Sequence, residues 1–186
     1  SLVIPALAES EDLPTTLYSL ARNKPELLET CLIIIVINQK PDSSLEIIAD
    51  NKKTIEILQE NSFKLPHLHY LDIITTNGVG EARKSGMDTA LQYLDFDANP
   101  LIFCLDADTL LEDNYLEEVS KLKEYPAAVV NFQHRLPADE TLAEAIIAYE
   151  FFMRYYVLGL RFANSPYAFH SIGSAMICRA KDYIKC

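Results

Sequence analysis

Two aspartates that follow a short apolar run are the residues of this chain best placed to do chemistry. The run Leu101–Leu105 is too short for a helix and has no polar residue, so it predicts a strand buried on both faces. Asp106 and Asp108 would then lie at the carboxyl end of that strand, where open α/β sheets bind ligands. Two carboxylates about 4 Å apart repel by roughly 4 kcal/mol at an effective dielectric constant near 20. A divalent cation removes that repulsion, and oxygen ligands suit magnesium, manganese or calcium.

Other apolar runs and helical patterns alternate along the chain and predict the scaffold. Strands are expected at Leu2–Ile4, Leu32–Ile37, Leu68–Thr75, Leu101–Leu105 and Ala127–Phe132. Helices are expected around Leu13–Ala21, Leu45–Leu58, Met87–Leu94 and Leu116–Leu122. In the second of these helices, Leu45, Ile48, Ile55 and Leu58 share the predicted apolar face, and Asp50 points away from it. Such alternation predicts one α/β domain with a mostly parallel central sheet flanked by helices.

The composition limits the partners and the compartment. The 186 residues carry 27 acidic and 16 basic side chains, a net charge of −11, which argues against nucleic acid as a partner. The four cysteines form no C-x-x-C pair, which argues against zinc and indicates a reduced, cytoplasmic compartment. The chain opens without a methionine or a signal peptide and stops after a helix-like start, so we expect a piece of a longer protein. No apolar run is long enough to span a bilayer.

The last third of the chain has a different pattern. Thr141 and Glu144 match a capping box that opens a long helix through about Leu160. The helix is rich in phenylalanine and tyrosine, which could line an acceptor groove or make a peripheral membrane contact. The favoured interpretation is a helix packed on the sheet. A glycine-containing loop, His170–Arg179, then leads into a final strand.

Two further segments could bind parts of a nucleotide. The strand Val3–Glu9 breaks at a proline, and its exposed backbone together with Glu9 could hold a nucleobase. The glycine-rich stretch Asn77–Gly86 runs into a helix, whose N-terminal amides attract phosphate, and Arg83 could add a charged contact. It is neither G-x-x-x-x-G-K-[ST] nor G-x-G-x-x-G, so a nucleotide triphosphatase or a dehydrogenase is not supported.

The order of these motifs resembles that of family-two glycosyltransferases of the GT-A fold. The matching pieces are Ile4-Pro5-Ala6 with Glu9, Gly80-x-Ala82-Arg83-x-x-Gly86, and Leu105-Asp106-Ala107-Asp108-Thr109. The resemblance covers nearly the whole chain, from Val3 to about Ile177. It implies one GT-A domain over residues 1–186, with a nucleotide-binding part at 1–133 and a partial acceptor-side part at 134–186.

The resemblance also implies roles for individual residues and a reaction. The nucleotide sugar would contact Pro5, Ala6, Leu7, Glu9, Asn38, Arg83 and Asp106, and Mn²⁺ or Mg²⁺ would be held by Asp106 and Asp108. The metal would stabilise the leaving diphosphate while a sugar passes, with inversion, from a nucleotide-sugar donor to a sugar, lipid or protein acceptor. The loop at Gly173 and Ser174 looks like the acceptor-side loop of the family.

This chain departs from the family pattern at two places. The general base of the family lies downstream of where the chain stops, and Asp182 comes too early to be assigned that role. Asn38 stands where the family usually has an aspartate that contacts uracil. An amide can bond a base edge without charge, so either Asp42 compensates or the base is not uracil.

Other interpretations stay open at this point. The aspartate pair could simply cap the next helix in a solvated loop. Leu101–Thr109 also matches the motif of haloacid-dehalogenase-type phosphatases, although those enzymes place it on an early strand and need a later acidic pair. A non-catalytic nucleotide-binding module is the third alternative. His170 could be a third metal ligand, or a loop histidine bonded to backbone, which is more common.

Overall fold

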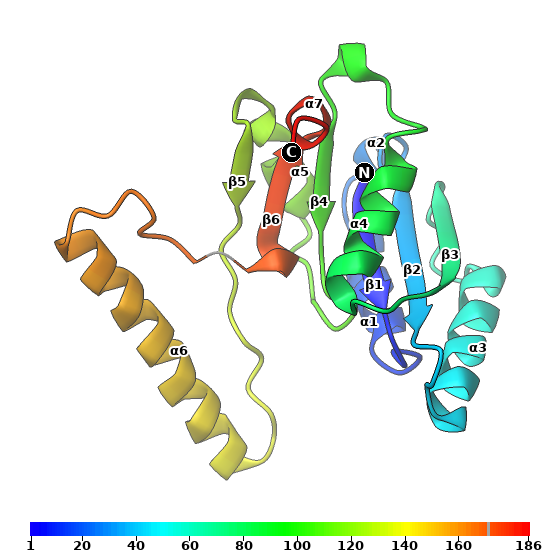
Figure 1. The fold of residues 1–186 in the computed structure, drawn as a ribbon, viewed down its shortest axis with the longest axis horizontal. Helices are drawn as coiled ribbons and strands as arrows, with labels where there is room; N and C mark the ends of the chain where they lie inside the picture. Colours follow the sequence, from blue (N-terminus) through cyan, green and yellow to red (C-terminus); the bar gives the residue numbers. More distant parts are fainter. Residues whose placement is uncertain (171) are drawn as a thin grey trace. The chain divides into compact units, whose positions relative to one another are not determined.

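The computed structural model describes residues 1–170 and 172–186, and there strands and helices alternate as the sequence predicts (Figure 1). The strands are β1 (Leu2–Ala6), β2 (Ile33–Gln39), β3 (Leu68–Ile74), β4 (Leu101–Cys104), β5 (Ala127–Val129) and β6 (Met176–Arg179). The α-helices are α1 (Leu13–Ala21), α2 (Pro25–Leu28), α3 (Leu45–Glu60), α4 (Val79–Ala90), α5 (Tyr115–Ser120), α6 (Glu140–Phe162) and α7 (Ala180–Tyr183). Short 3₁₀ turns are η1 (Phe96–Ala98), η2 (Lys121–Glu124) and η3 (Gly173–Ala175).

The strands form one six-stranded sheet in the order β3-β2-β1-β4-β6-β5. Strand β1 pairs in parallel with β2 and β4, β2 pairs in parallel with β3, and β6 runs antiparallel to β4. Every residue of β1 and β4 is buried, as expected for strands in the middle of a sheet that is covered on both faces. The predicted mixed α/β fold with a mostly parallel sheet is therefore confirmed.

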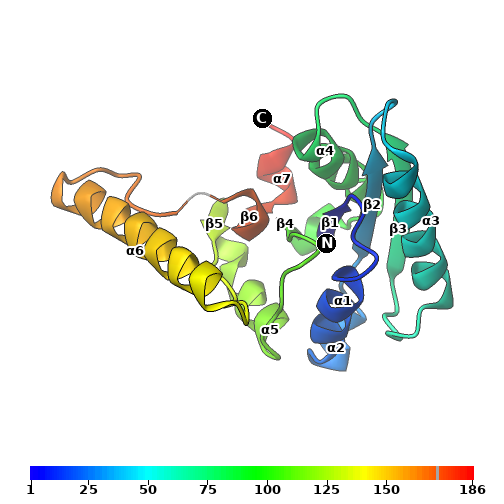
Figure 2. The same ribbon diagram turned by 90° about the horizontal axis from the view of Figure 1, so that it is seen from below.

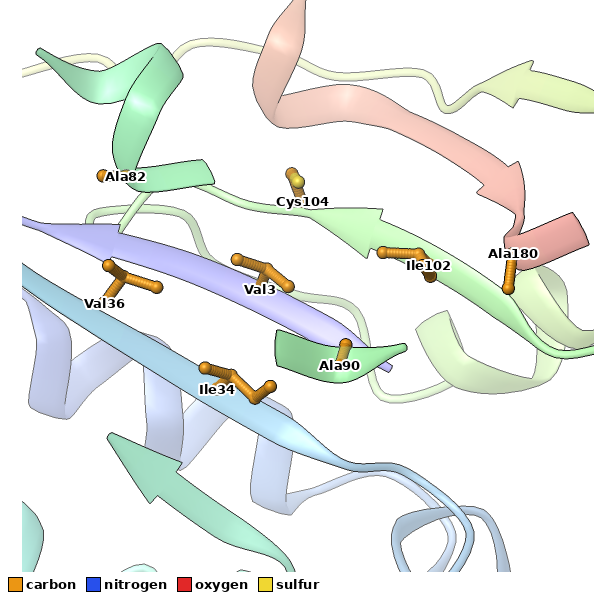
Figure 3. Close-up of a cluster of buried hydrophobic side chains, with 8 residues drawn as sticks. All are labelled: Val3, Ile34, Val36, Ala82, Ala90, Ile102, Cys104 and Ala180. Carbon is orange, nitrogen blue, oxygen red and sulfur yellow. The ribbon is translucent and has the colours of Figure 1, made fainter. Parts of the chain in front are cut away.

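The residues fall into two compact units, Ser1–Ala128 with Ile177–Cys186 and Val129–Met176. In the first unit, α4 and α7 cover one face of the sheet, and α1, α2 and α5 cover the other (Figure 2). Figure 3 shows the apolar cluster on the α4 side, where side chains of α4 meet those of β1 and β2. Its buried members are Val3, Ile34, Val36, Ala82, Ala90, Ile102, Cys104 and Ala180.

The inner face of α3 matches the predicted one only in part. Leu45 is 84% exposed, and the buried residues of the helix are Asn51, Thr54 and Leu58. The Nδ2 of Asn51 donates to the carbonyl of Asn38 at 3.1 Å. The expected apolar face is therefore wrong at Leu45 and right at Leu58, and Asn51 joins the buried residues because its side chain satisfies the backbone of a neighbouring segment.

The helix α6 begins earlier than the predicted capping box implies. Its N-cap is Asp139, whose side chain accepts a hydrogen bond from the amide of Leu142 at 2.8 Å. The capping box of Thr141 and Glu144 is therefore wrong, because Asp139 already supplies the cap two residues before Thr141. Only Val157 of this helix is buried, so the expected burial of the aromatic face is not found. More than half of the surface is exposed for Tyr149, Phe151, Phe152, Tyr155, Tyr156 and Phe162.

Among residues 1–170 and 172–186, no helix combines the length and the apolarity needed to cross a bilayer.

Candidate functional site

A cavity of about 330 Å³ lies in the first unit at the carboxyl ends of β1 to β4. Six of the eight predicted site residues line it: Pro5, Leu7, Glu9, Asn38, Asp106 and Asp108. Parallel strands end at the same edge of a sheet, which brings together side chains that are as much as a hundred positions apart in the sequence. The other two predicted residues do not line the cavity. Ala6 is buried within β1, and Arg83 contacts Asp106.

Five further residues line the cavity, which are Lys40, Thr75, Gly78, Val79 and Ala107. Sequence reasoning singled out none of them individually, although Gly78 and Val79 belong to the glycine-rich stretch that was expected to bind phosphate. Thr75 follows the last residue of β3, and its Oγ1 atom is buried without a hydrogen-bond partner in the described chain. Asn38 also lines the cavity and is only 4% exposed. Buried polar groups are rarely left unpaired, so Oγ1 of Thr75 can bond to a ligand in the cavity.

The loop after β1 is held in place by α3. Ala8 has a positive φ of 55°, and its amide donates to Oδ1 of Asn51 at 2.9 Å. The backbone amide and the hydroxyl of Ser10 both donate to the carboxylate of Asp50, at 3.0 and 2.7 Å. The helical pattern predicted that Asp50 points away from the protein. Its carboxylate instead accepts these two hydrogen bonds from the loop after β1. These bonds flank Glu9 on both sides and fix its position at the cavity.

The turn that carries the two aspartates is held by α1. Thr16 is buried, and its hydroxyl donates to the carbonyl of Ala107 at 2.6 Å. The amide of Thr109 donates to the carbonyl of Asp106 at 3.2 Å and closes the turn. Because Ala107 is buried between them, Asp106 and Asp108 can both face the cavity.

The two aspartates have different partners. Nη2 of Arg83 forms an ion pair with Oδ1 of Asp106, with side chains 21% and 42% exposed respectively. Asp108 is exposed and has no ion pair with any residue that the structure describes. One carboxylate of the pair is thus partly neutralised and the other is not.

The pKa of Glu9 reflects its burial and the excess of negative charge in this cavity. Burial, followed by the nearby carboxylates of Asp108, Asp12, Asp50 and Asp106, raises the pKa of Glu9 from its ordinary value of 4.5 to about 7. A cation in the cavity would lower this pKa, because it would favour the charged carboxylate.

We expect Glu9→Gln to stabilise the protein at high pH. A raised pKa means that the folded protein holds the proton more tightly than the unfolded chain does, so ionisation destabilises the fold as the pH rises toward 7. The variant should unfold with a free energy about 1 kcal/mol higher than wild type at pH 8, a value reduced because the side chain is partly solvated. The gain should vanish by about pH 3.5, which lies below both pKa values, because Glu9 is then protonated in the folded and in the unfolded state. Urea unfolding at the two pH values measures it.

The matched control is Glu11→Gln, an exposed position outside the cavity. This change should alter the free energy of unfolding by less than about 0.5 kcal/mol at either pH. An equal gain in the two variants would contradict the assignment of the effect to the cavity.

The glycine-rich stretch forms the start of α4. Gly78 is the N-cap, with φ of 72°, and Val79 begins the helix at the cavity. The carboxylate of Glu81 accepts hydrogen bonds from the amides of Thr76 and Asn77, both at 2.8 Å, and these bonds lower the pKa of Glu81. The two amides are therefore already bonded within the loop, and they are not the free donors that a phosphate needs.

The carboxylates of the cavity suit a cation that takes its remaining ligands from a substrate. Within the described residues, no cluster of three or more histidine, cysteine, aspartate or glutamate side chains is arranged to hold a metal ion. Magnesium is commonly bound by one or two carboxylates together with substrate phosphates, and Asp106 and Asp108 fit that pattern. His170 lies in the second unit, where its ring meets Phe132 edge-on at a centroid distance of 5.7 Å. Ser171 of the following loop lies outside the described residues.

Two solved structures resemble this chain in fold. A crystal structure of S. aureus TarS, residues 1–349, has a TM-score of 0.51 at 15% identity, over 72% of this chain and 35% of that one. A second crystal structure, of S. aureus TarS, gives 0.44 at 15% identity, over 74% and 23% of the two chains. The chain thus spans about a third of the length of the first structure. No curated protein matches it.

The sequence match is broader than the structural one. The family model described as glycosyl transferase family 2 matches residues 1–183, which is nearly the whole chain. The chain therefore belongs to glycosyl transferase family 2.

Proposed function

We propose that this domain binds a nucleoside-diphosphate sugar together with Mn²⁺ or Mg²⁺ and transfers the sugar, with inversion, to a sugar, lipid or protein acceptor. The family membership supports sugar transfer in general, and it replaces the phosphatase interpretation of the aspartate pair. The observation that supports the donor and the metal is the cavity at the strand ends, which gathers Glu9, Asn38, Asp106 and Asp108.

The two sides of the cavity would receive different parts of the donor. Near the ends of β1, β2 and β3, Pro5 and Leu7 offer apolar contacts to a nucleobase. The amide of Asn38 and the unpaired hydroxyl of Thr75 suit the polar edge of the base. Near the end of β4, Asp106 and Asp108 would hold the metal beside the diphosphate. When bound, the metal would act as a Lewis acid that neutralises the diphosphate leaving group.

The proposed reaction also needs a base that activates the acceptor. Inverting transfer requires a group that takes the proton from the acceptor hydroxyl. Asp182 pairs with Arg179 at 2.5 Å and with Lys185 at 2.9 Å, so it is committed to structural contacts. We assign no base among the described residues.

Calorimetric titration tests this proposal. UDP, CDP, GDP and ADP are titrated into the protein with Mn²⁺ and with EDTA, and at least one should bind in a metal-dependent way. Equal binding in both conditions would contradict the metal site, and no binding of any nucleotide would contradict the donor site. Release of nucleoside diphosphate from the matching nucleotide sugar then separates an active transferase from a module that binds without turnover.

A further inference from the structure

Arg83 reaches the aspartate pair from a firmly packed position on α4. Its neighbour Ala82 is fully buried, and Gly86, one turn later, lies against Val3 and Val36 of the central strands. The side chain of Arg83 is mostly buried, and Nη2 donates to Asp106. The backbone that carries Arg83 is thus fixed relative to Asp106.

The guanidinium of Arg83 does not form all the hydrogen bonds that it could donate. Its Nε atom is buried and has no hydrogen-bond partner in the described part of the chain. An arginine normally binds a carboxylate or a phosphate through two parallel hydrogen bonds, and here only the bond from Nη2 is made. A buried, unpaired donor on a side chain that contacts the lining residue Asp106 therefore points to a ligand that presents two oxygens.

Arg83 competes with a cation for Asp106 as long as no substrate is bound. Asp106 already has Arg83 as counter-ion, and Lys40 adds a second positive charge to the cavity lining. No third protein ligand is arranged to complete a metal site among the described residues. A metal ion alone would have to separate Arg83 from Asp106 and would gain few ligands in return.

We propose that Arg83 is a positioning residue that neutralises Asp106 in the empty site and moves to the diphosphate when metal and nucleotide bind together. In this exchange Asp106 replaces the guanidinium with the cation, and Nε and Nη2 of Arg83 donate to phosphate oxygens. Metal and nucleotide therefore bind cooperatively, because each needs the other to complete the exchange. This inference rests on the proposed function.

Substitution of Arg83 should change two affinities in opposite directions. In Arg83→Met the apolar part of the side chain stays and the charge is lost. We expect Mn²⁺ alone to bind about tenfold more tightly than to wild type, since Asp106 is then free. At saturating Mn²⁺, the nucleoside diphosphate that binds wild type best should bind about tenfold more weakly, because the charge-assisted bonds are lost. Free Mn²⁺ measured by electron paramagnetic resonance gives the first affinity, and calorimetry gives the second.

Two further variants separate this role from a structural one. Arg83→Lys keeps the charge and should keep the weak binding of Mn²⁺ alone. Lys84→Met removes the same charge from the next position, where the side chain is exposed and paired with Asp88, and should change neither affinity more than twofold. Thermal unfolding shows whether each variant is folded, and Arg83→Gln takes the place of Arg83→Met if that variant is not.

The outcomes are distinct. Unchanged or weaker binding of Mn²⁺ alone to Arg83→Met overturns the proposal, since a merely structural loss would weaken both affinities together. Absence of nucleotide binding in every protein, wild type included, contradicts the proposed function instead. The titration with Mn²⁺ alone would even then test whether Arg83 competes for Asp106.

Discussion

Replacing Asp108 by alanine should abolish the metal-dependent part of nucleoside-diphosphate binding, with a loss of affinity of about 100-fold or more. Asp108 is exposed at the cavity and has no ion pair within the described chain, whereas Asp106 is already paired with Arg83. Of the two carboxylates, Asp108 is thus the one that a cation can approach without displacing an arginine. Its loss leaves only Asp106, whose carboxylate is already paired with Arg83, so the cation loses the one carboxylate of the pair that it can reach without displacing a counter-ion.

The measurement compares titrations with Mn²⁺ and with EDTA in both proteins. Asp113→Ala is the matched control, because Asp113 is an exposed aspartate paired with Arg22 and lies outside the cavity. It removes the same charge and should leave nucleotide affinity within about twofold. If Asp108→Ala retained the metal dependence of wild type, the metal would have to be bound elsewhere.

Much of this site could be predicted because a parallel sheet aligns the ends of its strands. Once the apolar runs are assigned as strands, the residues just after them, such as Glu9, Asn38 and Asp106, must gather at one edge. The prediction needs only the strand type and the chain direction, and both are encoded locally. The resemblance of the motif order to that of a known family then indicated which of these residues bind the donor and the metal.

What could not be predicted depends on contacts between segments that are far apart in the sequence. The bonds from Ala8 to Asn51 and from Thr16 to Ala107 join elements 43 and 91 residues apart, and no local pattern encodes them. The same holds for the contact between Arg83 and Asp106, which are 23 residues apart. Tertiary partners also decided that polar Asn51 is buried on α3 and that apolar Leu45 is exposed.

A similar limit applies to helix α6. The choice between Asp139 and Thr141 as N-cap depends on the φ and ψ angles of the residues before the helix, and both residue types are good caps. The exposure of its aromatic side chains could not be predicted either, since an amphipathic pattern indicates an apolar face and does not name what covers it.

The second large effect is expected at Gly86. A Cβ atom at this position would lie against Cγ1 of Val3 and within 2.7 Å of Cγ2 of Val36, both on buried central strands. Neither valine can move aside, because both belong to the close-packed cluster beneath α4 (Figure 3). We therefore expect Gly86→Ala to lower the free energy of unfolding by about 1–3 kcal/mol, although alanine is the better helix former.

Gly80→Ala on the same helix is the control. A Cβ atom there meets nothing within 4 Å, so helix propensity alone should act and the variant should gain up to about 1 kcal/mol. Urea unfolding of the two variants should thus give changes of opposite sign from the same substitution. Because α4 also carries Arg83, displacing the helix at Gly86 should weaken nucleotide binding as well, whereas Gly80→Ala should not. Equal stability of Gly86→Ala and wild type would mean that α4 can move away from β1 and β2 at no cost, and the fixed placement of Arg83 beside Asp106 would then lose its structural basis.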